Sequence, residues 1–403
     1  MKIIQINSVC GHGSTGVIAV EIAQLLKRKG HECYIAYGQG STDYPNSFKI
    51  GSTIENKLHA LIFTRILGLQ GYGNILGTRR LIRWIKSISP DVIQLHNLHG
   101  NYLNFPILFK FLAESNIPVV WALFDCWSFT GKCTHFTACG CRKWETLCKE
   151  CPQLHKSGGV TYFFDRTEKM YKDKQKLFSA LPKLDIIVCS EWLKNEVQRS
   201  FFRGRPIHKI YNWIDPSKFA PVEDKTTYKR YGLDPQKKIL ISVSAIWMKN
   251  SNRFQDAVRL ANILPNEYQL VIVGKKQNIT IPSNIIHIPF VEGTHELSKL
   301  YTHALAFVGF SIEDTFGKVF AEAMLCGTPC VVFDSTACPE VIGDTGYTVP
   351  PHDVQMMLQK VEEINKKGKR YYSTHCIERV KLNYNYEANV SQYIDIYQRL
   401  CNK

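Results

Sequence analysis

Carboxylates and backbone N–H groups are expected to gather in one stretch of the chain, which runs from 310 to 350. It reads FSIEDTFGKVFAEAMLCGTPCVVFDSTACPEVIGDTGYTVP. The acidic pair Glu313–Asp314 precedes a Phe-Gly turn, and we expect a helix to begin directly after that turn. The first N–H groups of a helix have no intrahelical partners and suit a phosphate; here they belong to Gly317, Lys318 and Val319. Glu322, one turn further, can accept hydrogen bonds from sugar hydroxyls. The alternative is a solvated acidic loop followed by a helical glutamate.

Two apolar runs flank these groups and are predicted to be strands of one sheet. A strand at 305–308 leads into the acidic pair, the helix ends at Gly327, and a strand at 329–333 follows. Strand, loop, helix and strand in this order form the unit of an open parallel sheet. Such sheets bind ligands outside the carboxyl ends of their strands, so this is where we expect the acidic pair and the helix start.

The spacing of these residues resembles the donor-site signature of the retaining glycosyltransferases of family 4. That signature is an acidic residue, seven further residues and a glutamate, with Phe-Gly just after the first acid. Asp314 and Glu322 take the two acidic positions, and the runs CGTPCVVF, PEV and TGYTVPPHD match the rest. Most members have glutamate first, so Asp314 is a departure, and Glu313 beside it could share the role. The resemblance implies that Asp314 and Glu322 are catalytic residues, with Glu322 holding the nucleotide ribose and the first acid holding the donor sugar.

A glycine-rich turn near the start of the chain lies between a strand at 3–6 and a helix expected at 17–29. Its sequence, GHGSTG, fits the G-x-G-x-x-G spacing that lets the backbone approach a phosphate or sugar closely. A dinucleotide site would also need an acid at the end of the second strand, 33–37, where Tyr37 stands instead. In family 4 this loop faces the donor diphosphate and the acceptor. Gly13 and Gly16 are therefore candidate substrate-binding residues, with a tight turn as the alternative.

Polar and aromatic residues follow two more expected strands, at 91–95 and 119–123. The runs LHNLHGNYLN and FDCWSFTGKC resemble a subgroup of family 4 associated with bacterial exopolysaccharide assembly of the colanic-acid and capsule type. We take Asp125 as a catalytic candidate. The subgroup usually has histidine where this chain has Phe124, and that histidine is expected to bond the donor sugar near its 6-hydroxyl. We therefore expect a preference for 6-deoxy or otherwise 6-modified donors, unless Asp125 binds that hydroxyl.

Cations for a leaving diphosphate are expected after the strand at 239–244. Family 4 enzymes carry a Gly-Arg and a lysine in this loop, and the Gly-Arg is absent here. Lys249 and Arg253 are the substitutes, with ordinary surface charges as the alternative. Gly274 ends a strand at 270–273, where the nucleotide of such enzymes often lies.

The chain has 14 cysteines, and six of them fall between 126 and 151. Clustered cysteines in an intracellular chain indicate a metal rather than disulfides. We expect a structural zinc ion bound by Cys133, Cys141, Cys148 and Cys151, which form C-x7-C-x6-C-x2-C. Cys126, Cys139 and His135 are alternative ligands, and ordinary packed or surface thiols are the alternative interpretation. No cofactor is expected for catalysis.

The net charge of +15 is concentrated in the first half, where residues 1–220 carry 29 basic and 16 acidic side chains. Residues 221–403 carry 21 and 19. The imbalance predicts an anionic partner. Because no nucleic-acid-binding motif appears, we expect an anionic lipid surface or a lipid-linked phosphate, and no nucleic acid. The contact would be the basic, apolar helical region 55–90, which could also be a solvated helix face; its cations are Lys57, Arg65, Arg79, Arg80, Arg83 and Lys86.

No run of 18 apolar residues and no signal-peptide pattern appears. We therefore expect a cytoplasmic protein, peripheral on the inner face of the cell membrane. The 403 residues are too many for one ordinary core. The resemblance implies an α/β fold of two doubly wound, Rossmann-like domains facing across a cleft, the GT-B arrangement. We expect an acceptor-side domain at 1–212 with a Cys-rich insertion at about 126–151, a linker region at 213–236, a nucleotide-sugar-binding domain at 237–385, and a last helix at 386–403 that crosses back to the first domain.

The resemblance implies a retaining, metal-independent glycosyltransferase of hexosyltransferase type. Its donor would be a UDP- or GDP-linked sugar, its acceptor a lipid-linked saccharide, and its product a bacterial surface polysaccharide. Three other functions stay open. They are a sugar-nucleotide epimerase on the same fold, a non-catalytic scaffold of a polysaccharide complex, and a dinucleotide-dependent oxidoreductase.

Overall fold

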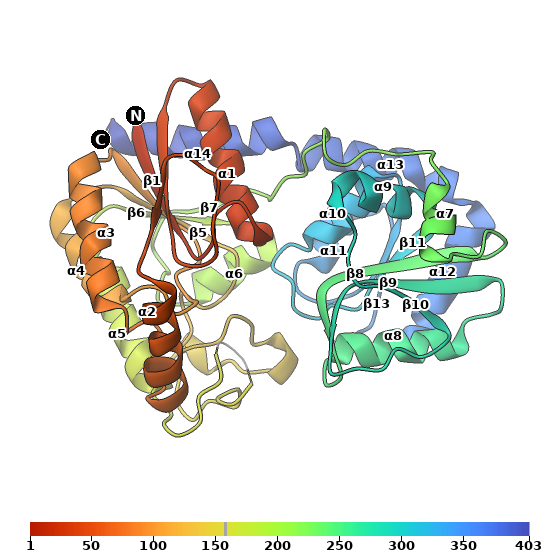
Figure 1. The fold of residues 1–403 in the computed structure, drawn as a ribbon, viewed down its shortest axis with the longest axis horizontal. Coiled ribbons are helices and arrows are strands. Elements are labelled where there is room, and N and C mark those ends of the chain that lie inside the picture. Colours follow the sequence, from red (N-terminus) through yellow and green to blue (C-terminus); the bar gives the residue numbers. More distant parts are fainter. Residues whose placement is uncertain (157–158, 403) are drawn as a thin grey trace. The chain divides into compact units, whose positions relative to one another are not determined.

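The computed structural model describes residues 1–156 and 159–402, which form two compact units, each an α/β domain (Figure 1). Unit 1 comprises Met1–Ile210 and the C-terminal segment from Val390, and unit 2 comprises Tyr211–Asn389. Among the described residues no helix is both long and apolar enough to cross a membrane.

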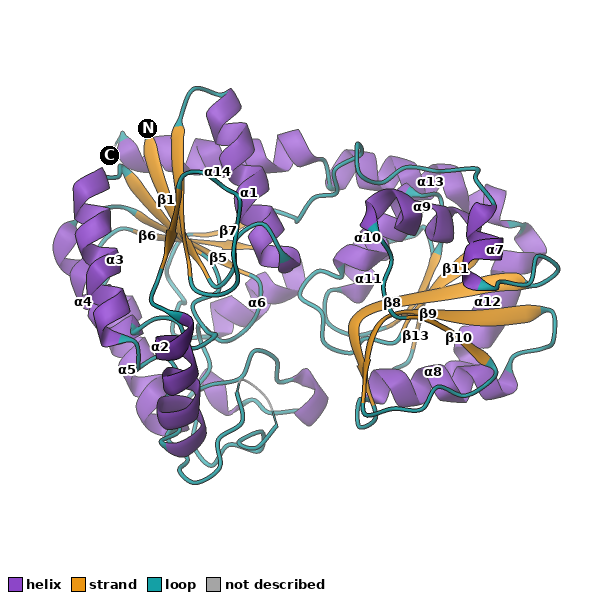
Figure 2. Cartoon of the chain, viewed as in Figure 1, coloured by secondary structure: helices purple, strands orange, loops and turns teal. Residues whose placement is uncertain are grey.

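Unit 1 is built on a seven-stranded parallel sheet with the order β3-β2-β1-β4-β5-β6-β7. Its strands are β1 Lys2–Asn7, β2 Glu32–Tyr37, β3 Ser47–Lys49, β4 Val92–Leu95, β5 Val119–Leu123, β6 Leu184–Val188 and β7 Ile207–Lys209. Its helices are α1 Gly13–Arg28, α2 Thr53–Leu58, the π-helix η1 His59–Ile66, α3 Ile75–Ile88, α4 Phe105–Ser115, α5 Thr167–Ser179 and α6 Glu191–Arg199, with short 3₁₀ turns η2 Thr137–Cys139 and η3 Lys143–Glu145. Strands β4, β5 and β6 are buried at every position. That pattern is typical of parallel strands covered by helices on both faces (Figure 2).

Unit 2 is built on a six-stranded parallel sheet with the order β10-β9-β8-β11-β12-β13. Its strands are β8 Lys238–Met248, β9 Tyr268–Gln277, β10 Ile285–Ile288, β11 Ala304–Gly309, β12 Cys330–Phe333 and β13 Tyr347–Val349. Its helices are α7 Thr226–Tyr231, α8 Asn252–Ile263, α9 Gly293–His303, α10 Lys318–Leu325, α11 Cys338–Ile342, α12 Val354–Lys367 and α13 Lys369–Asn383. In both sheets the strand order turns back beside the first strand of the unit. Ligands of doubly wound folds bind at that point, outside the carboxyl ends of the strands.

The last helix, α14, spans Tyr386–Cys401. From Val390 onward it belongs to unit 1, where Tyr397 and Leu400 are buried. Lys29 Nζ donates to Ser391 Oγ at 3.1 Å, and Arg399 Nη2 donates to Asp185 Oδ2 at 2.5 Å. The apolar face of this helix therefore completes the core of unit 1, although its sequence lies nearly 200 residues beyond the rest of that unit.

The observed elements differ from the predicted ones mainly where local signals are weak. The first helix begins at Gly13, inside the glycine-rich turn, instead of at 17. Region 55–90 is helical as predicted, but it consists of α2, η1 and α3, and a non-helical stretch with Gly68, Gly71 and Gly73 separates η1 from α3. Helix α7 lies within the segment predicted to be a linker. The strands β3, β7 and β13 were not predicted, since three residues carry too little alternation to detect.

Candidate functional site

The start of helix α10 in unit 2 offers backbone N–H groups at the edge of the sheet. Gly317 is its N-cap with φ +80°, and no side chain caps this end. A Cβ at Gly317 would lie 2.5 Å from the ring of Phe320, so glycine is required both by the backbone angle and by the close contact. Lys318 and Val319, the next two residues, are half-buried. The uncapped helix start is the kind of site that binds a phosphate.

Glu322 lies one turn into α10 and is half-buried. The hydroxyl of Tyr301, from α9, donates to Glu322 Oε2 over a long 3.5 Å. Burial raises the pKa of Tyr301 well above its usual value, so this hydroxyl stays a neutral donor. A carboxylate has about four acceptor positions, so Glu322 can also accept bonds from ligand hydroxyls.

The loop that carries Glu313 and Asp314 is held by its backbone. The N–H of Asp314 donates to Thr336 Oγ1 at 3.1 Å, and the carbonyl of Asp314 accepts from the N–H of Ala337 at 3.2 Å. The N–H of Glu313 donates to Ser311 Oγ at 3.4 Å. The two backbone bonds of Asp314 fix the loop against the β12–α11 connection.

Arg253, near the start of α8, links strand β8 to the residues that follow β11. Its Nη1 donates to Ser244 Oγ in β8 at 2.7 Å, and its Nη2 donates to Ser311 Oγ after β11 at 2.8 Å. Burial raises the pKa of the Cys338 thiol; the charge of Asp314 adds to that rise and the charge of Arg253 opposes it. Both charges therefore act on one thiol, which brings Arg253 and Asp314 into the same neighbourhood. Lys249 instead lies in the exposed turn after β8.

The local backbone geometry by itself requires glycine at position 274. It lies in β9 with φ +130°, and a Cβ there would lie 1.8 Å from the carbonyl oxygen of Ser244. Its own carbonyl accepts a hydrogen bond from His287 at 2.8 Å when Nε2 carries the proton. The close approach of β8 and β9 requires a glycine here, so a nucleotide-binding role for Gly274 rests on the resemblance alone.

The glycines of unit 1 shape the start of α1. Gly13 is its first residue, and a Cβ at Gly16 would lie 3.1 Å from Val9 Cγ2 and 3.2 Å from the N of Gly11. His12 caps no N–H with its side chain and instead places Nδ1 at 3.0 Å from the carbonyl of Cys10. A pocket of about 380 Å³ adjoins this turn, lined by Cys10, Gly11, His12, Val20, Gln24 and 41–45.

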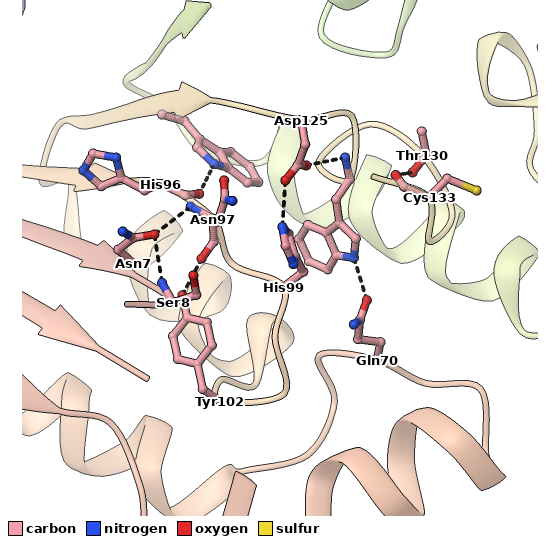
Figure 3. Close-up of polar contacts among 12 residues, drawn as sticks. Asn7, Ser8, Gln70, His96, Asn97, His99, Tyr102, Asp125, Thr130 and Cys133 are labelled. Atoms are coloured by element: carbon pink, nitrogen blue, oxygen red, sulfur yellow. Dashed lines mark hydrogen bonds and ion pairs between the residues drawn. The ribbon is translucent and has the colours of Figure 1, made fainter. Parts of the chain in front are cut away.

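Asp125 and His99 form a pair at the carboxyl ends of β5 and β4 (Figure 3). Asp125 Oδ2 lies 2.7 Å from His99 Nε2, and Asp125 Oδ1 accepts the N–H of Trp127 at 2.8 Å. The indole N–H of Trp127 donates to Gln70 Oε1 at 3.0 Å. Burial by itself would raise the pKa of Asp125, but the charge and hydrogen bond of His99, the Trp127 N–H and the charge of His135 hold that pKa below its usual value. The carboxylate is thus kept ionised.

Phe124 is stacked on His96, with ring centroids 5.8 Å apart and planes 8° from parallel. His96 is 1% exposed, and its Nε2 lies 2.7 Å from Gln5 Oε1. Burial lowers the pKa of His96 to about 3, so its ring is neutral. A buried, fixed imidazole therefore sets the orientation of the half-buried Phe124 ring.

The four cysteines predicted to bind zinc all line one small cavity, of about 20 Å³, in the irregular segment between β5 and α5. Within the described ranges 1–156 and 159–402, however, no three His, Cys, Asp or Glu side chains are already grouped as metal ligands. Of the three alternative ligands, Cys139 is exposed, Cys126 is buried and His135 is half-buried.

The structure also shows polar groups that the sequence analysis did not single out. His99 is the partner of Asp125, Tyr301 contacts Glu322, and Ser244 and Ser311 hold Arg253. Only His99 had a visible signal, because it lies in the quoted run LHNLHG after a predicted strand. The other pairs, 9 to 58 residues apart, have no such motif to mark them.

Two family models match the chain and together span most of it. Glycosyltransferase Family 4 matches residues 15–218, and Glycosyl transferases group 1 matches residues 224–381. WcaC of Escherichia coli strain K12, which is named as a colanic acid biosynthesis glycosyl transferase, is 25% identical over 421 residues, covering 99% of this chain and 100% of WcaC. N-acetyl-alpha-D-glucosaminyl L-malate synthase of Bacillus anthracis is 29% identical, covering 53% of this chain and 58% of that enzyme.

Solved structures agree with this match at the level of fold. HepE of Anabaena in complex with UDP and glucose superimposes with a TM-score of 0.69 at 12% identity, covering 99% of this chain and 100% of HepE. Sucrose-phosphate synthase from Thermosynechococcus elongatus gives a TM-score of 0.69 at 14% identity, covering 99% and 98%. The predicted class, two Rossmann-like parallel-sheet domains of the GT-B type, is confirmed. The chain therefore belongs to glycosyltransferase family 4 and is a glycosyltransferase.

Proposed function

We propose that this protein transfers a hexose-type sugar, with retention, from a nucleotide-sugar donor to a lipid-linked saccharide during synthesis of a bacterial surface polysaccharide. The observation that carries the proposal is the uncapped start of α10 at Gly317, with Glu322 one turn beyond it and Arg253 bonded to Ser311 at the same edge of the sheet. Anion-binding N–H groups, a cation and a hydroxyl-binding carboxylate are what a sugar diphosphate needs.

Departure of the nucleoside diphosphate places negative charge on a phosphate oxygen, which fixed positive groups can stabilise. In our proposal the N–H groups at Gly317, Lys318 and Val319 face that charge, and Arg253 and Lys249 supply cations. Arg253 is held by two serine hydroxyls, whereas Lys249 is exposed, so we assign the larger share to Arg253. Asp314, with Glu313, positions the donor sugar, and the departing phosphate takes the acceptor proton. No side chain is assigned as a covalent nucleophile.

Relatives and neighbours support the substrate classes. WcaC is named for colanic acid biosynthesis, and an O-antigen chain mannosyltransferase B of Escherichia coli is 44% identical over 59 residues. Both names concern surface polysaccharides. The HepE structure contains UDP and glucose, so a UDP-linked sugar is our first choice and a GDP-linked one the second.

We also propose that unit 1 docks on an anionic membrane, where a lipid-linked acceptor would be found. Large apolar side chains are exposed on α2 and η1, including Ile54 at 70%, Leu58 at 49% and Leu61 at 50%. An aromatic loop, 162–164, lies beside them: the N–H of Tyr162 donates to the carbonyl of Arg65 at the end of η1 at 2.8 Å. Exposed apolar groups next to exposed cations are typical of a helix that lies in a membrane interface. Ile62 in η1 and Phe163 and Phe164 in the loop extend this apolar surface, and Ile75 and Leu76 at the start of α3 are also exposed.

A donor screen tests the proposed reaction. The purified protein is incubated with UDP- and GDP-linked sugars, with and without a lipid-linked saccharide, and release of nucleoside diphosphate is followed. We expect release that depends on both one donor class and the acceptor. Acceptor-independent conversion of the donor would indicate an epimerase, and donor binding without turnover would indicate a scaffold; either result overturns the proposal.

A further inference from the structure

The segment between β5 and α5, residues 124–166, is long and irregular, yet parts of it are buried. Apart from two 3₁₀ turns its described residues form no helix or strand, while Trp144 is 1% exposed and Phe136 is 3% exposed. Their rings pack at 4.8 Å between centroids. A loop of this length inside a compact domain is uncommon without a function or a cross-link that holds it. Its ordered interior therefore calls for a stabilising element beyond the small aromatic cluster.

Four thiols meet at the centre of this segment. Cys133, Cys141, Cys148 and Cys151 line the cavity of about 20 Å³, although they are up to 18 residues apart in the sequence. The volume exceeds one water-sized sphere, about 10–15 Å³, and so is large enough for one small ion. Cys139 is exposed and is not among the lining residues.

N–H groups are directed at two of the four sulfurs that line the cavity. The N–H of Gly131 donates to Cys148 Sγ at 3.2 Å, and Gln153 Nε2 donates to Cys133 Sγ at 3.6 Å. N–H donors aimed at sulfur are common around thiolates that bind metals. Both sulfurs thus already accept hydrogen bonds in the way that a ligating thiolate does.

Two buried lysines flank the same thiols. Lys174 is 0% exposed, and its Nζ donates to the carbonyls of Trp127 at 2.6 Å and Thr130 at 3.0 Å. Lys132, itself one of the lining residues, is 4% exposed and donates to the carbonyls of Leu154 and Gly159 at 2.7 and 2.8 Å. Carbonyl oxygens satisfy the donors but carry no net charge, and a buried cation is stable only near a compensating anion. Burial lowers the pKa of Lys174 well below its usual value, and negative charge on Cys148, Asp125 or Cys133 would oppose that fall.

We infer that this segment is a structural zinc site in which Cys133, Cys141, Cys148 and Cys151 bind one Zn²⁺ as thiolates. Each thiol gives up a proton to solvent on binding, so four thiolates and one Zn²⁺ carry a net charge of −2, which Lys132 and Lys174 offset. Structural zinc sites are closed and tetrahedral, and four cysteines are one of their usual ligand sets. Because no three ligand side chains are yet grouped within the described residues, binding has to draw the thiols inward, which couples zinc to ordering of the loop.

Elemental analysis of the full chain, expressed with zinc and purified without chelator, tests the inference. We expect one zinc per chain in the wild type and in Cys139→Ser, the matched control. The zinc content of Cys148→Ser should fall to background, whereas Cys148→His should keep the metal, because imidazole is also a zinc ligand.

Wild-type protein with only background zinc, or with a Cys133–Cys151 disulfide by mass spectrometry, would overturn the inference. So would retention of full zinc by Cys148→Ser. If Cys148→Ser does not fold, Co²⁺ substitution of the wild type decides: absence of thiolate-to-cobalt absorption bands counts against the site.

Discussion

His99 Nε2 and Asp125 Oδ2 lie 2.7 Å apart at the carboxyl ends of adjacent strands, and the Asp125 side chain is only 12% exposed. A carboxylate in this setting is ionised because His99 and the Trp127 N–H favour its charge more strongly than burial opposes it. Removing one partner of such a pair leaves a buried polar group unsatisfied. The pair therefore holds together the loops that follow β4 and β5. It also places a histidine, which can accept or donate a proton, at this edge of the sheet.

Asp125→Asn tests the stability role of this pair. Folding lowers the pKa of Asp125, so its contribution is present above the unfolded value of about 3.9 and is lost as pH falls through the lower folded value. We expect the variant to be less stable by about 1–3 kcal/mol at neutral pH. Its loss of stability between neutral pH and pH 3 should be smaller than that of the wild type. Urea unfolding measured across this pH range gives both the free energy of unfolding at neutral pH and its change with pH. If the free energies of unfolding of the wild type and the variant changed with pH in parallel, the stabilising role of the His99–Asp125 pair would be contradicted.

Glu322→Ala should abolish most transfer by weakening nucleotide binding. A hydrogen bond to a charged group contributes about 1.5–3 kcal/mol, so each lost bond corresponds to about 10- to 100-fold in affinity. Nucleoside diphosphate affinity by calorimetry, together with transfer rate, measures the effect. Glu378→Ala, an exposed glutamate on α13, is the control and should bind as the wild type does. Wild-type affinity in Glu322→Ala would show that the donor-site assignment is wrong.

Arg253→Ala should lower kcat far more than Lys249→Ala does. Arg253 is held by Ser244 in β8 and Ser311 after β11, and loss of one preorganised charge-stabilising group typically reduces kcat by about 10²–10³-fold. Arg253→Lys should recover little, because lysine cannot span both hydroxyls. Steady-state kinetics of the three variants measures these changes in kcat. Equal losses of kcat in Arg253→Ala and Lys249→Ala would contradict the larger role assigned to Arg253.

The helix start at Gly317 was predictable because its signal is local, whereas the side-chain contacts around it were not. Gly317 begins a helix for reasons contained in a few neighbouring residues, so spacing along the chain was enough. The contacts Tyr301–Glu322 and Arg253–Ser311 depend on which loop residues face each other after folding. His99 is the intermediate case: adjacent strands placed it near Asp125, but Gly100 and Asn101, both with positive φ, determine where the loop turns. Similarly, the interrupted helix 55–90 reflects close packing at Gly71 and Gly73, against Phe105 and His59, which periodicity does not reveal.

Membrane docking should depend on apolar side chains as well as on charge. A Leu58→Ser, Leu61→Ser, Phe163→Ser variant should float with anionic vesicles less than the wild type, and Leu382→Ser, which removes an 81% exposed leucine from unit 2, should not. Binding should also weaken with salt, since the Debye length falls from ~10 Å at 0.1 M to ~3 Å at 1 M. Flotation of the protein with vesicles of phosphatidylglycerol and phosphatidylcholine measures both the apolar and the electrostatic contribution to binding. Equal binding of all variants, or equal binding to neutral vesicles, would count against this surface.

Phe124 is expected to set the preference at carbon 6 of the donor sugar. The resemblance places a histidine of related enzymes near the 6-hydroxyl, and phenylalanine can neither donate nor accept a hydrogen bond. A 6-hydroxyl buried against this ring would lose a partner, at about 1–3 kcal/mol, whereas a 6-methyl group would gain apolar contact. The parallel stacking on the neutral His96 holds the Phe124 ring in one orientation, and moving the ring aside for a hydroxyl would break that stacking. We therefore expect wild-type protein to favour a 6-deoxy donor over its 6-hydroxy counterpart and Phe124→His to reverse that order.

Asp125 is the adjacent group that could serve a 6-hydroxyl instead, and comparing matched donors in Phe124→His and Asp125→Asn separates the two. A wild-type preference for the hydroxylated donor that Phe124→His leaves unchanged would refute the expectation.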